Sequence, residues 1–540
     1  MPATLTINGL DAPVPPGATL FTCAESIGVR VPTSCQMQGK CKECMVEVSE
    51  GVECLSPRTE HERHLSGNYR LSCRTQIVAD YGHVRCHTMR RGHMRIERET
   101  AGHSPARYEP DPVGDAAYGI AMDLGTTTVV LRLFDLRTGD QLADASFENP
   151  QRFGGSDVMS RIHYDSQHPG KLLRRTLAGY LAHAIEDFPV DPQSIGEMVV
   201  VGNSTMRDLF FRQSVYSIGQ SPYQSVTELQ KAEGRRTTTS LVETGRRCLL
   251  PIHPQARVYG APIISGHVGA DAAACMLAVD LAHEDRLVAI MDIGTNTELI
   301  VGNRHRILAA SCPAGPAFEG GAIACGMPAL DGAIENVTLG DNGVFRLSVI
   351  GGGPPEGICG SGLVSLMSEL LRTGRMNEMG RFEQDGGRIT LDREHDIFFL
   401  ESDVNELAQA KGANVAGLHV VAGNYGIDFD EIDVFYLAGG FGRNLAVEAS
   451  RRIGLIPNIP DSRIVQVGNA AIEGASMALL SASKRRELEA LVSQVEHCRL
   501  ETHEGFFDFF VEGCQFKPVD SLRDVGPAAS PAALTREVAG

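Results

Sequence analysis

One seven-residue pattern occurs twice in this 540-residue chain, 169 residues apart. Met122–Thr128 reads Met-Asp-Leu-Gly-Thr-Thr-Thr, and Met291–Thr297 reads Met-Asp-Ile-Gly-Thr-Asn-Thr. Each copy lies between two short apolar segments, and apolar runs around a tight Gly-Thr turn predict a β-hairpin. Because both hairpins sit in the same context, the sequence predicts an α/β protein in which a similar unit occurs twice.

The turn of each hairpin offers donors to a phosphate, because backbone N–H groups and hydroxyls point out of such turns. The candidate phosphate-binding residues are Gly125, Thr126, Thr127, Gly294, Thr295 and Asn296. Asp123 and Asp292 end the first strand of each hairpin, where a carboxylate can hold Mg²⁺ directly or through water. One Asp-x-Gly-Thr is a weak signal, whereas two in matching strand contexts form a strong one.

Three further glycine-containing junctions fit a nucleotide site. The strand 432–437 runs into Gly439, Gly440 and Gly442, which allow a base and its ribose to approach the backbone. Asn203 and Ser204 stand where the strand around 198–201 enters a helix, and Gly360 and Ser361 precede a second, clear helix at Val364–Leu371. Exposed N–H groups at such starts bind anions, but a tight turn with Ser204 or Ser361 as N-cap gives the same pattern.

Two carboxylates are open to more than one interpretation. Glu319, in the unusual loop 312–321, either orients the attacking water, contacts Mg²⁺, or caps the following helix. Asp271 has the same alternatives. We take Asp123, Asp292 and Glu319 as the candidate catalytic residues.

The 14 cysteines crowd toward the N-terminus. Cys35, Cys41 and Cys44 follow a Cys-x5-Cys-x2-Cys spacing, and 28 residues separate Cys44 from Cys73. Three thiolates in one loop with a distant fourth are typical of a 2Fe–2S ferredoxin, although plant-type ferredoxins have four residues in the first gap. Zinc is the competing interpretation, but its sites usually pair two short cysteine knuckles.

Cys73 is the preferred fourth ligand because Arg-Leu-Ser-Cys-Arg-Thr resembles the return segment of known ferredoxins. Cys54 and Cys86 are rival fourth ligands, and Cys23 is expected in the core. Strands are expected at 4–7, around 12–14 and at 45–48, with a hairpin turn at Asn8-Gly9 and a helix over 20–29 capped by Thr19.

A basic segment follows this domain: residues 85–98 contain five arginines. It either guides an acidic redox partner or is a solvated strand end, and both interpretations stay open. Proline and glycine then predict a linker over 89–116.

The order of these motifs along the chain resembles that of known families. The hairpins and the Ala-Gly-Gly-Phe-Gly strand end resemble the ASKHA superfamily, whose members clamp ATP between two RNase H-like lobes. With the ferredoxin motif in front, the chain resembles the reductive activators of corrinoid proteins. The expected fold is therefore a multidomain α/β chain: a β-grasp ferredoxin-like domain (1–88), the linker (89–116), a first ASKHA lobe (117–206), a C-terminal ASKHA domain (207–516) and a flexible tail (517–540).

The resemblance implies a 2Fe–2S cluster, ATP and Mg²⁺. It also implies an enzyme that spends ATP to pass an electron from a cellular donor through the cluster to an inactive Co(II) corrinoid protein, giving Co(I). A homodimer through the C-terminal lobe is compatible with it. The alternatives are an activator of a radical dehydratase, a small-molecule kinase with a redox-sensing ferredoxin domain, and a chaperone-like ATPase.

Charge and hydropathy limit the partners. The net charge of −18 argues against general binding of nucleic acid or anionic membranes. No apolar run reaches the length of a transmembrane helix, and the first residues lack a secretory pattern, so we expect a cytoplasmic location.

Overall fold

The structure is a computed structural model that describes residues 3–90, 111, 114, 116–168, 170–340, 342–383, 386–440 and 444–520. The chain divides into two compact units. Unit 1 contains Met1–Ala282, Ala329–Asp331 and Asn469–Val495, and unit 2 contains the rest. Among the described residues, no helix has both the length and the apolar character needed to cross a membrane.

The first domain of unit 1 is a five-stranded sheet in the order β2-β1-β5-β3-β4. Strands β1 and β5 are parallel, and the other neighbours are antiparallel. This is the β-grasp arrangement expected for residues 1–88. Its elements are β1 (Thr4–Ile7), β2 (Leu10–Ala12), α1 (Leu20–Ser26), β3 (Met45–Glu50), β4 (Tyr69–Leu71) and β5 (His83–His87).

Local sequence signals explain most of this domain. Asn8 and Gly9 have φ values of 52° and 79°, the left-handed conformations that a tight hairpin turn requires. The Thr19 hydroxyl accepts a hydrogen bond from the Thr22 N–H, so the predicted cap of α1 is confirmed. The second strand ends at Ala12 instead of reaching residue 14, because Pro13 has no N–H to pair. Helix α1 ends at Ser26, short of the expected residue 29.

A buried carboxylate ties the ferredoxin domain together. Glu62 is fully buried and accepts hydrogen bonds from Arg70 Nε at 2.9 Å, the Thr59 N–H at 2.8 Å and the Leu71 N–H at 3.1 Å. Burial alone raises the pKa of this carboxyl, but Arg70 and the two backbone donors outweigh it and lower the pKa to about 2.

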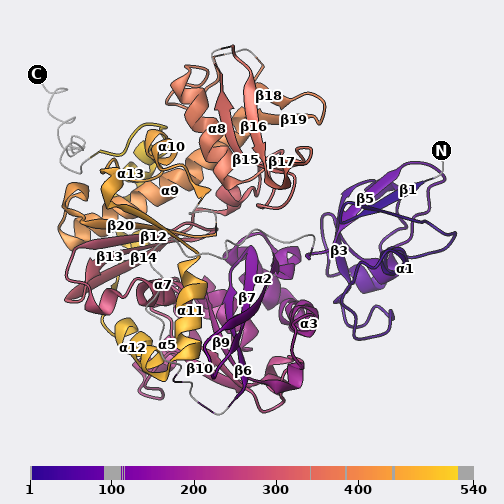
Figure 1. Cartoon of the computed structure of the whole chain (residues 1–540), viewed down its shortest axis with the longest axis horizontal. Helices are drawn as coiled ribbons and strands as arrows, with labels where there is room; N and C mark the ends of the chain where they lie inside the picture. The colour runs from indigo at the N-terminus through magenta and orange to yellow at the C-terminus, as the bar shows by residue number, and fades with distance from the viewer. Residues whose placement is uncertain are drawn as a thin grey trace, which may run out of the picture. The chain divides into compact units, whose positions relative to one another are not determined.

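Two six-stranded sheets follow, one in each unit, and five strands of each have the same arrangement, whereas the sixth strand is added at opposite edges; several of these strands are labelled in Figure 1. The first has the order β10-β11-β9-β6-β7-β8, and the second has the order β21-β20-β12-β13-β14-β22. In each, the repeated hairpin is antiparallel and its first strand pairs in parallel with a later strand: β6 with β9, and β12 with β20. The repeated sequence motif therefore marks two lobes that contain the same strand arrangement.

The first sheet belongs to unit 1 and reaches beyond residue 206, where we expected the first lobe to end. Strands β10 and β11 extend it to Gly260, and Asn469–Val495 returns to the same unit as two helices. Its elements are β6 (Tyr118–Leu124), β7 (Thr128–Asp135), β8 (Gln141–Glu148), α2 (Val158–Gln167), α3 (Leu172–Glu186), β9 (Ile195–Gly202), α4 (Ser204–Phe210), α5 (Val226–Ala232), β10 (Leu241–Thr244), α6 (Gly245–Cys248), β11 (Arg257–Gly260), α7 (Ala270–Ala278), α11 (Ala470–Leu480) and α12 (Ala482–Val492).

Unit 2 combines the second sheet with smaller sheets and a long central helix, α9. Helix α8 begins at Gly360, four residues before the clear helical pattern of the sequence. The elements are β12 (Val288–Asp292), β13 (Thr297–Asn303), β14 (Arg306–Cys312), β15 (Ala333–Leu339), β16 (Phe345–Val349), β17 (Gly357–Ile358), α8 (Gly360–Arg372), β18 (Arg388–Asp392), β19 (Ile397–Leu400), α9 (Glu401–Tyr425), β20 (Val434–Ala438), α10 (Val447–Arg452), β21 (Ile464–Gly468), β22 (Val495–His497) and α13 (Phe506–Gly513).

Two expected segments lie largely outside the described residues. Of the predicted linker, the structure describes 89, 90, 111, 114 and 116, and of the predicted tail it describes 517–520. The described start of the tail is paired, because Val519 forms a parallel bridge with Pro457 and Asp520 accepts a hydrogen bond from the Asn458 amide at 2.8 Å.

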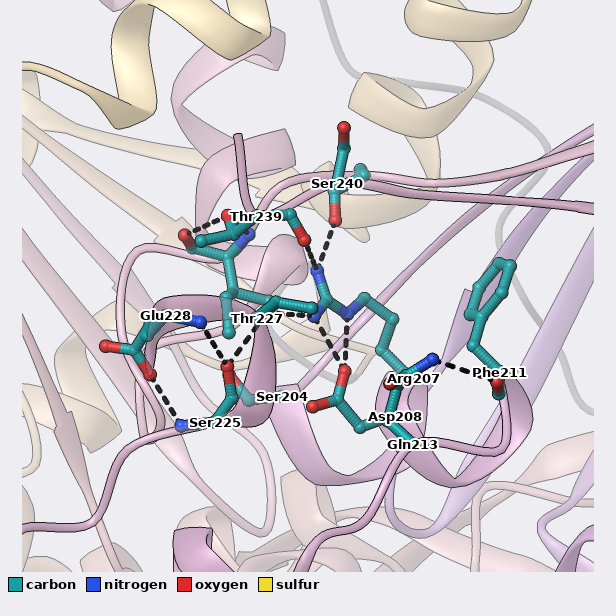
Figure 2. Close-up of polar contacts among 12 residues, drawn as sticks. Ser204, Arg207, Asp208, Phe211, Gln213, Ser225, Thr227, Glu228, Thr239 and Ser240 are labelled. Carbon is teal, nitrogen blue, oxygen red and sulfur yellow. Dashed lines mark hydrogen bonds and ion pairs between the residues drawn. The ribbon is translucent and has the colours of Figure 1, made fainter. Parts of the chain in front are cut away.

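A buried arginine organises the short helix α4 (Figure 2). Arg207 Nε and Nη2 donate to Asp208 Oδ1 at 3.0 and 2.6 Å, and both residues are fully inaccessible to solvent. Arg207 Nη1 donates to the carbonyls of Thr239 and Ala261 at 2.9 Å each, and Nη2 donates to Thr227 Oγ1 at 3.1 Å. One side chain thus joins α4 to α5 and to the segments beside β10 and β11.

Candidate functional site

The segment Cys35–Cys44 forms a loop in which several residues have left-handed backbone conformations. Gln36, Met37, Gly39 and Lys42 all have positive φ values, between 49° and 71°. Glycine is favoured at position 39, because its φ of +71° is strained for other residues and a Cβ there would lie 2.5 Å from Arg74 Nε, which would have to move. Burial raises the pKa of the Cys35 thiol, but hydrogen bonds from the backbone of residues 38, 40 and 41 and from the Cys41 thiol outweigh this and lower it to about 7. The loop therefore favours a thiolate.

The four predicted ligands come together as two pairs. The Sγ atoms of Cys44 and Cys73 are 3.2 Å apart, and the thiols of Cys35 and Cys41 are hydrogen bonded. Two thiolates on one tetrahedral metal ion with bonds of about 2.3 Å are separated by about 3.8 Å, so small shifts let each pair hold one metal. Two such pairs, three thiols from the loop and one from Cys73, fit a two-iron cluster.

The rival cysteines have other surroundings. Cys54 Sγ lies 3.9 Å from the Tyr81 carbonyl oxygen. Cys86, on β5, is fully buried close to Cys23, and burial raises the pKa of its thiol to about 12. Cys23 is itself buried, as expected for a core thiol. Neither rival forms a pair like that of Cys44 and Cys73.

In unit 1 the first repeated hairpin is held by polar contacts around its turn. Gly125 N–H donates to the Thr128 carbonyl at 2.9 Å, which closes the turn. Asn149, the residue after β8, supports the turn. Its side-chain amide donates to the Gly125 carbonyl at 2.8 Å, and its N–H donates to the Thr127 carbonyl at 2.7 Å. The hydroxyl of Thr126 accepts a hydrogen bond from the Asn203 side chain at 2.9 Å.

Asn203 and Ser204 lie beside this hairpin, as the sequence suggested. Asn203 caps α4 by accepting from the Met206 N–H at 3.0 Å, and Ser204 Oγ donates to the Ser265 carbonyl at 2.7 Å. A strand does pass into a capped helix here, but the cap is Asn203 and not Ser204, which is the first residue of the helix; Ser361 is likewise not the cap of α8, since that position is Cys359. The bond between Asn203 and Thr126 also connects this helix start to the phosphate-type turn.

One residue of the unit 1 site was not predicted from the sequence. Asn469 caps α11 and its side-chain amide donates to Asp123 Oδ2 at 2.9 Å. A signal was present, because Val467-Gly468-Asn469 repeats Val201-Gly202-Asn203, and both triplets lead from a strand into a helix. Asp271, the other uncertain carboxylate of this unit, lies in the first turn of α7 and accepts from the Ala272 N–H at 2.8 Å.

In unit 2 the second hairpin carries its own carboxylates. Asp292 ends β12, and Gly294 and Asn296 lie in the turn. The Thr295 hydroxyl donates to Glu319 Oε2 in a short hydrogen bond, and the Thr295 carbonyl accepts from the Gly315 N–H at 2.8 Å. Glu319 therefore contacts the phosphate-type turn and not only its own loop.

The glycines after β20 lie against the same hairpin. Gly439 has φ +110°, and a Cβ on it would lie 2.3 Å from the Ile293 carbonyl oxygen, so only glycine fits. Gly440 is exposed with open space around its Cα. Gly442 lies outside the described residues. Gly360 and Ser361 open α8, where the Ser361 hydroxyl is 3.4 Å from Cys359 Sγ.

Three known families match successive parts of the chain. Residues 5–78 match the 2Fe-2S iron-sulfur cluster binding domain. Residues 118–284 match the RACo middle region, and residues 286–523 match the C-terminal domain of RACo, the ASKHA domain. The chain is thus a ferredoxin-type domain joined to an ASKHA-type domain.

Whole-chain comparisons agree. A relative from Eubacterium limosum, named corrinoid activation enzyme RamQ, is 30% identical over 465 residues, covering 81% of this chain and 75% of the relative. A Methanosarcina barkeri protein, named [Co(II) methylated amine-specific corrinoid protein] reductase, is 25% identical over 73% of this chain and 76% of its own length. A solved structure titled reductive activator for corrinoid, iron-sulfur protein superposes with a TM-score of 0.69 at 25% identity, over 96% of this chain and 98% of that one. The chain belongs to the family of reductive activators of corrinoid proteins.

Proposed function

We propose that this protein reduces the Co(II) corrinoid of a partner protein to Co(I), by one electron passed through a 2Fe–2S cluster and with ATP hydrolysis as the driving reaction. The observation that carries the proposal is the presence in one chain of a four-thiol ferredoxin loop and two matching phosphate-type hairpins. An electron carrier alone needs no ATP, and a kinase alone needs no cluster. The names of its relatives identify the acceptor as a corrinoid protein.

The ligand set we propose for the cluster is Cys35, Cys41, Cys44 and Cys73. When bound, the cluster supplies reversible one-electron carriage. The protein holds the thiols in two pairs and surrounds Cys35 with N–H donors, which stabilise negative charge on the sulfur. Cys41, Cys44 and Cys73 are 0 to 4% exposed, so water reaches this part of the site poorly.

For ATP we propose that the repeated hairpin turn of each unit offers donors to phosphate. Their donors are Gly125, Thr126, Thr127, Gly294, Thr295 and Asn296. Asp123 and Asp292 would hold Mg²⁺, which neutralises the phosphate charge. Asn203, Ser204, Gly360 and Ser361 would add N–H or hydroxyl donors, and Gly439, Gly440 and Gly442 would admit the base and ribose.

Glu319 is our candidate for orienting the attacking water. Its bond to Thr295 places it at the phosphate-type turn, where a carboxylate can accept a proton from water. ATP binding and hydrolysis then bias the protein toward conformers in which electron transfer to Co(II) is favourable, since a ligand shifts an equilibrium by its different affinity for the two states.

Three finer points belong to the same proposal. A cellular reductant supplies the electron to the cluster. The protein works in the cytoplasm, which is supported by its 14 cysteines, all of them described, forming no disulfide. It forms a homodimer through the C-terminal lobe, supported by the exposed apolar side chains of Phe507 (69%) and Val511 (50%) on α13.

Two substitutions test the two halves of the proposal separately. Cys41→Ala should abolish the cluster's visible absorption, with Cys54→Ala as the matched control that keeps it. Asp292→Ala should lose ATP hydrolysis and keep the cluster spectrum. A normal spectrum in Cys41→Ala rejects the ligand set, and unchanged turnover in Asp292→Ala rejects the metal role of that carboxylate.

A further inference from the structure

The ferredoxin domain contacts helix α3 within unit 1, and a tyrosine stands at the centre of the contact. Tyr180 on α3 is fully buried, and its hydroxyl donates to the Met45 carbonyl at 3.0 Å. The Met89 N–H donates to the same hydroxyl at 3.5 Å. Met45 directly follows Cys44, so α3 reaches the backbone next to a proposed cluster ligand. The buried Tyr180 hydroxyl needs these hydrogen-bond partners, because burying a hydroxyl without a partner costs free energy.

Two further positions on α3 meet the loop between the second and third ligands. Thr176 Oγ1 donates to the Lys42 carbonyl at 3.4 Å. At Gly179, a Cβ would lie 3.1 Å from Glu43 Cγ and 3.4 Å from Pro32 Cβ. Glycine inside a helix costs about 1 kcal/mol relative to alanine, so its presence is explained by this close approach.

The C-terminal end of α3 adds charge pairs to the contact. Glu186 and Asp187 accept from Arg30 at 3.0 and 2.5 Å, and Asp187 also accepts from Arg90 at 2.8 Å. Acidic groups at a helix C-terminus oppose the helix dipole, so helix stability does not explain them. The arginines that bind these two acidic groups explain their presence instead. Arg90 belongs to the basic segment 85–98, so this arginine serves an internal contact; residues 91–98 lie outside the described residues.

The contact leaves one side of the cluster loop open. Cys41, Cys44 and Cys73 are buried, whereas Cys35 is partly exposed. The segment after Cys35 is also exposed: Met37 is 43% accessible, and Lys40 faces solvent. Electron exchange between proteins falls steeply with distance, so a partner must approach the accessible edge.

We propose that α3 is a docking face that holds the ferredoxin domain by its cluster loop, with Tyr180 and Asp187 as positioning residues, so that electrons enter and leave through the edge formed by Cys35–Lys40. The proposal rests on the proposed ligand set. It goes beyond that set because it assigns one route to the cluster and an internal partner to the ferredoxin domain.

A disulfide trap tests the docking in the full-length, cluster-loaded protein. The distance of 3.4 Å between Pro32 Cβ and a Cβ at position 179 lies just below the range of about 3.5–4.5 Å that a disulfide needs, so a small shift allows one to form. Pro32→Cys with Gly179→Cys should form the cross-linked peptide under mild oxidation, as detected by mass spectrometry. Pro32→Cys with Asp140→Cys is the control, because Asp140 lies at the opposite end of the β7–β8 hairpin from Glu148, whose N–H donates to Met89. Equal yields from the two pairs overturn the docking.

A charge exchange keeps the test valid if the cysteine at position 179 disturbs the helix. Asp187→Arg should lower the yield of the trap severalfold, and adding Arg30→Asp should restore part of it. In the protein without new cysteines, the same Asp187→Arg change should raise the radius of gyration measured by X-ray scattering. An unchanged radius and an unchanged yield contradict the proposal.

The accessible edge is tested by the rate of cluster reduction. Lys40→Glu should slow reduction by dithionite, an anionic reductant, severalfold at low ionic strength, and the difference should shrink in salt. Arg85→Glu changes an exposed arginine on β5 by the same charge and should have a smaller effect. Equal slowing by both variants overturns the assigned edge. The disulfide yield does not depend on which cysteines bind iron, so a failed trap and a failed ligand set are distinguishable.

Discussion

Replacing Arg207 by methionine should strongly destabilise the middle region. The guanidinium is completely buried and makes five hydrogen bonds, two to Asp208 and three to Thr227, Thr239 and Ala261 (Figure 2). Methionine keeps most of the volume but removes every one of these donors. Two carbonyls and a buried carboxylate then lose their partner, and breaking a buried ion pair from one side costs about 3–5 kcal/mol.

The loss should depend on pH, with a sign set by Asp208. Burial raises the pKa of this carboxyl, although Arg207 opposes the rise. Without the arginine the pKa rises further above its value in the unfolded chain. A carboxyl with a raised folded pKa favours the folded state at low pH and disfavours it as the pH rises. The Arg207→Met variant should therefore be closer to wild type near pH 5 than near pH 8.

Scanning calorimetry measures both effects. For a region of this size, about 1 kcal/mol corresponds to a shift of about 2–4 °C in Tm, so we expect the transition of the middle region to fall by about 10 °C at pH 8. Adding Asp208→Asn removes the stranded charge and should recover part of the loss. A fall below about 2 °C, or a fall of equal size at both pH values without recovery in the double variant, refutes the reasoning.

Three further predictions follow from single positions. Glu62→Gln should lose about 3 kcal/mol near neutral pH, because a carboxyl with its pKa lowered to about 2 stabilises the fold above its unfolded pKa; by calorimetry, the difference from wild type should shrink as the pH falls from 6 to 3, and a constant difference contradicts this. Gly439→Ala should abolish ATP hydrolysis and lower Tm, because its Cβ has no room, whereas Gly440→Ala should keep the wild-type Tm; equal Tm values in the two variants would be contrary to the structure. Asn469→Ala removes the cap of α11, worth about 1 kcal/mol, and a hydrogen bond that orients Asp123, so it should weaken binding of MgATP in titration calorimetry; wild-type affinity would show that this bond has no role.

Sequence alone predicted the parts of this protein that depend on neighbouring residues. The two hairpins form because a Gly-Thr turn between apolar strands determines its own conformation, and the cysteine spacing places three thiols in one loop. The same local logic predicted the cap at Thr19 and the turn at Asn8.

Contacts between distant segments were not predictable in the same way. Asn469 meets Asp123 across 346 residues, because the chain returns to unit 1 after building most of unit 2. The first lobe continues beyond residue 206 for a related reason: β10, at the edge of the sheet, and its neighbour β11 are short strands of four residues each, with little periodicity to reveal them. The bond from Tyr180 to Met45 depends on how two domains pack, and no spacing in the sequence encodes it.

The central claim is that ATP drives an electron through this protein to a corrinoid. Its most direct test mixes the protein, with its cluster reduced, with a Co(II) corrinoid protein in the absence and presence of MgATP, and follows the absorption of Co(I). We expect Co(I) to appear with MgATP and not without it, and to be lost when Asp292→Ala replaces the wild type. Co(I) formed equally well without ATP, or absent with every corrinoid protein tried, would contradict the account.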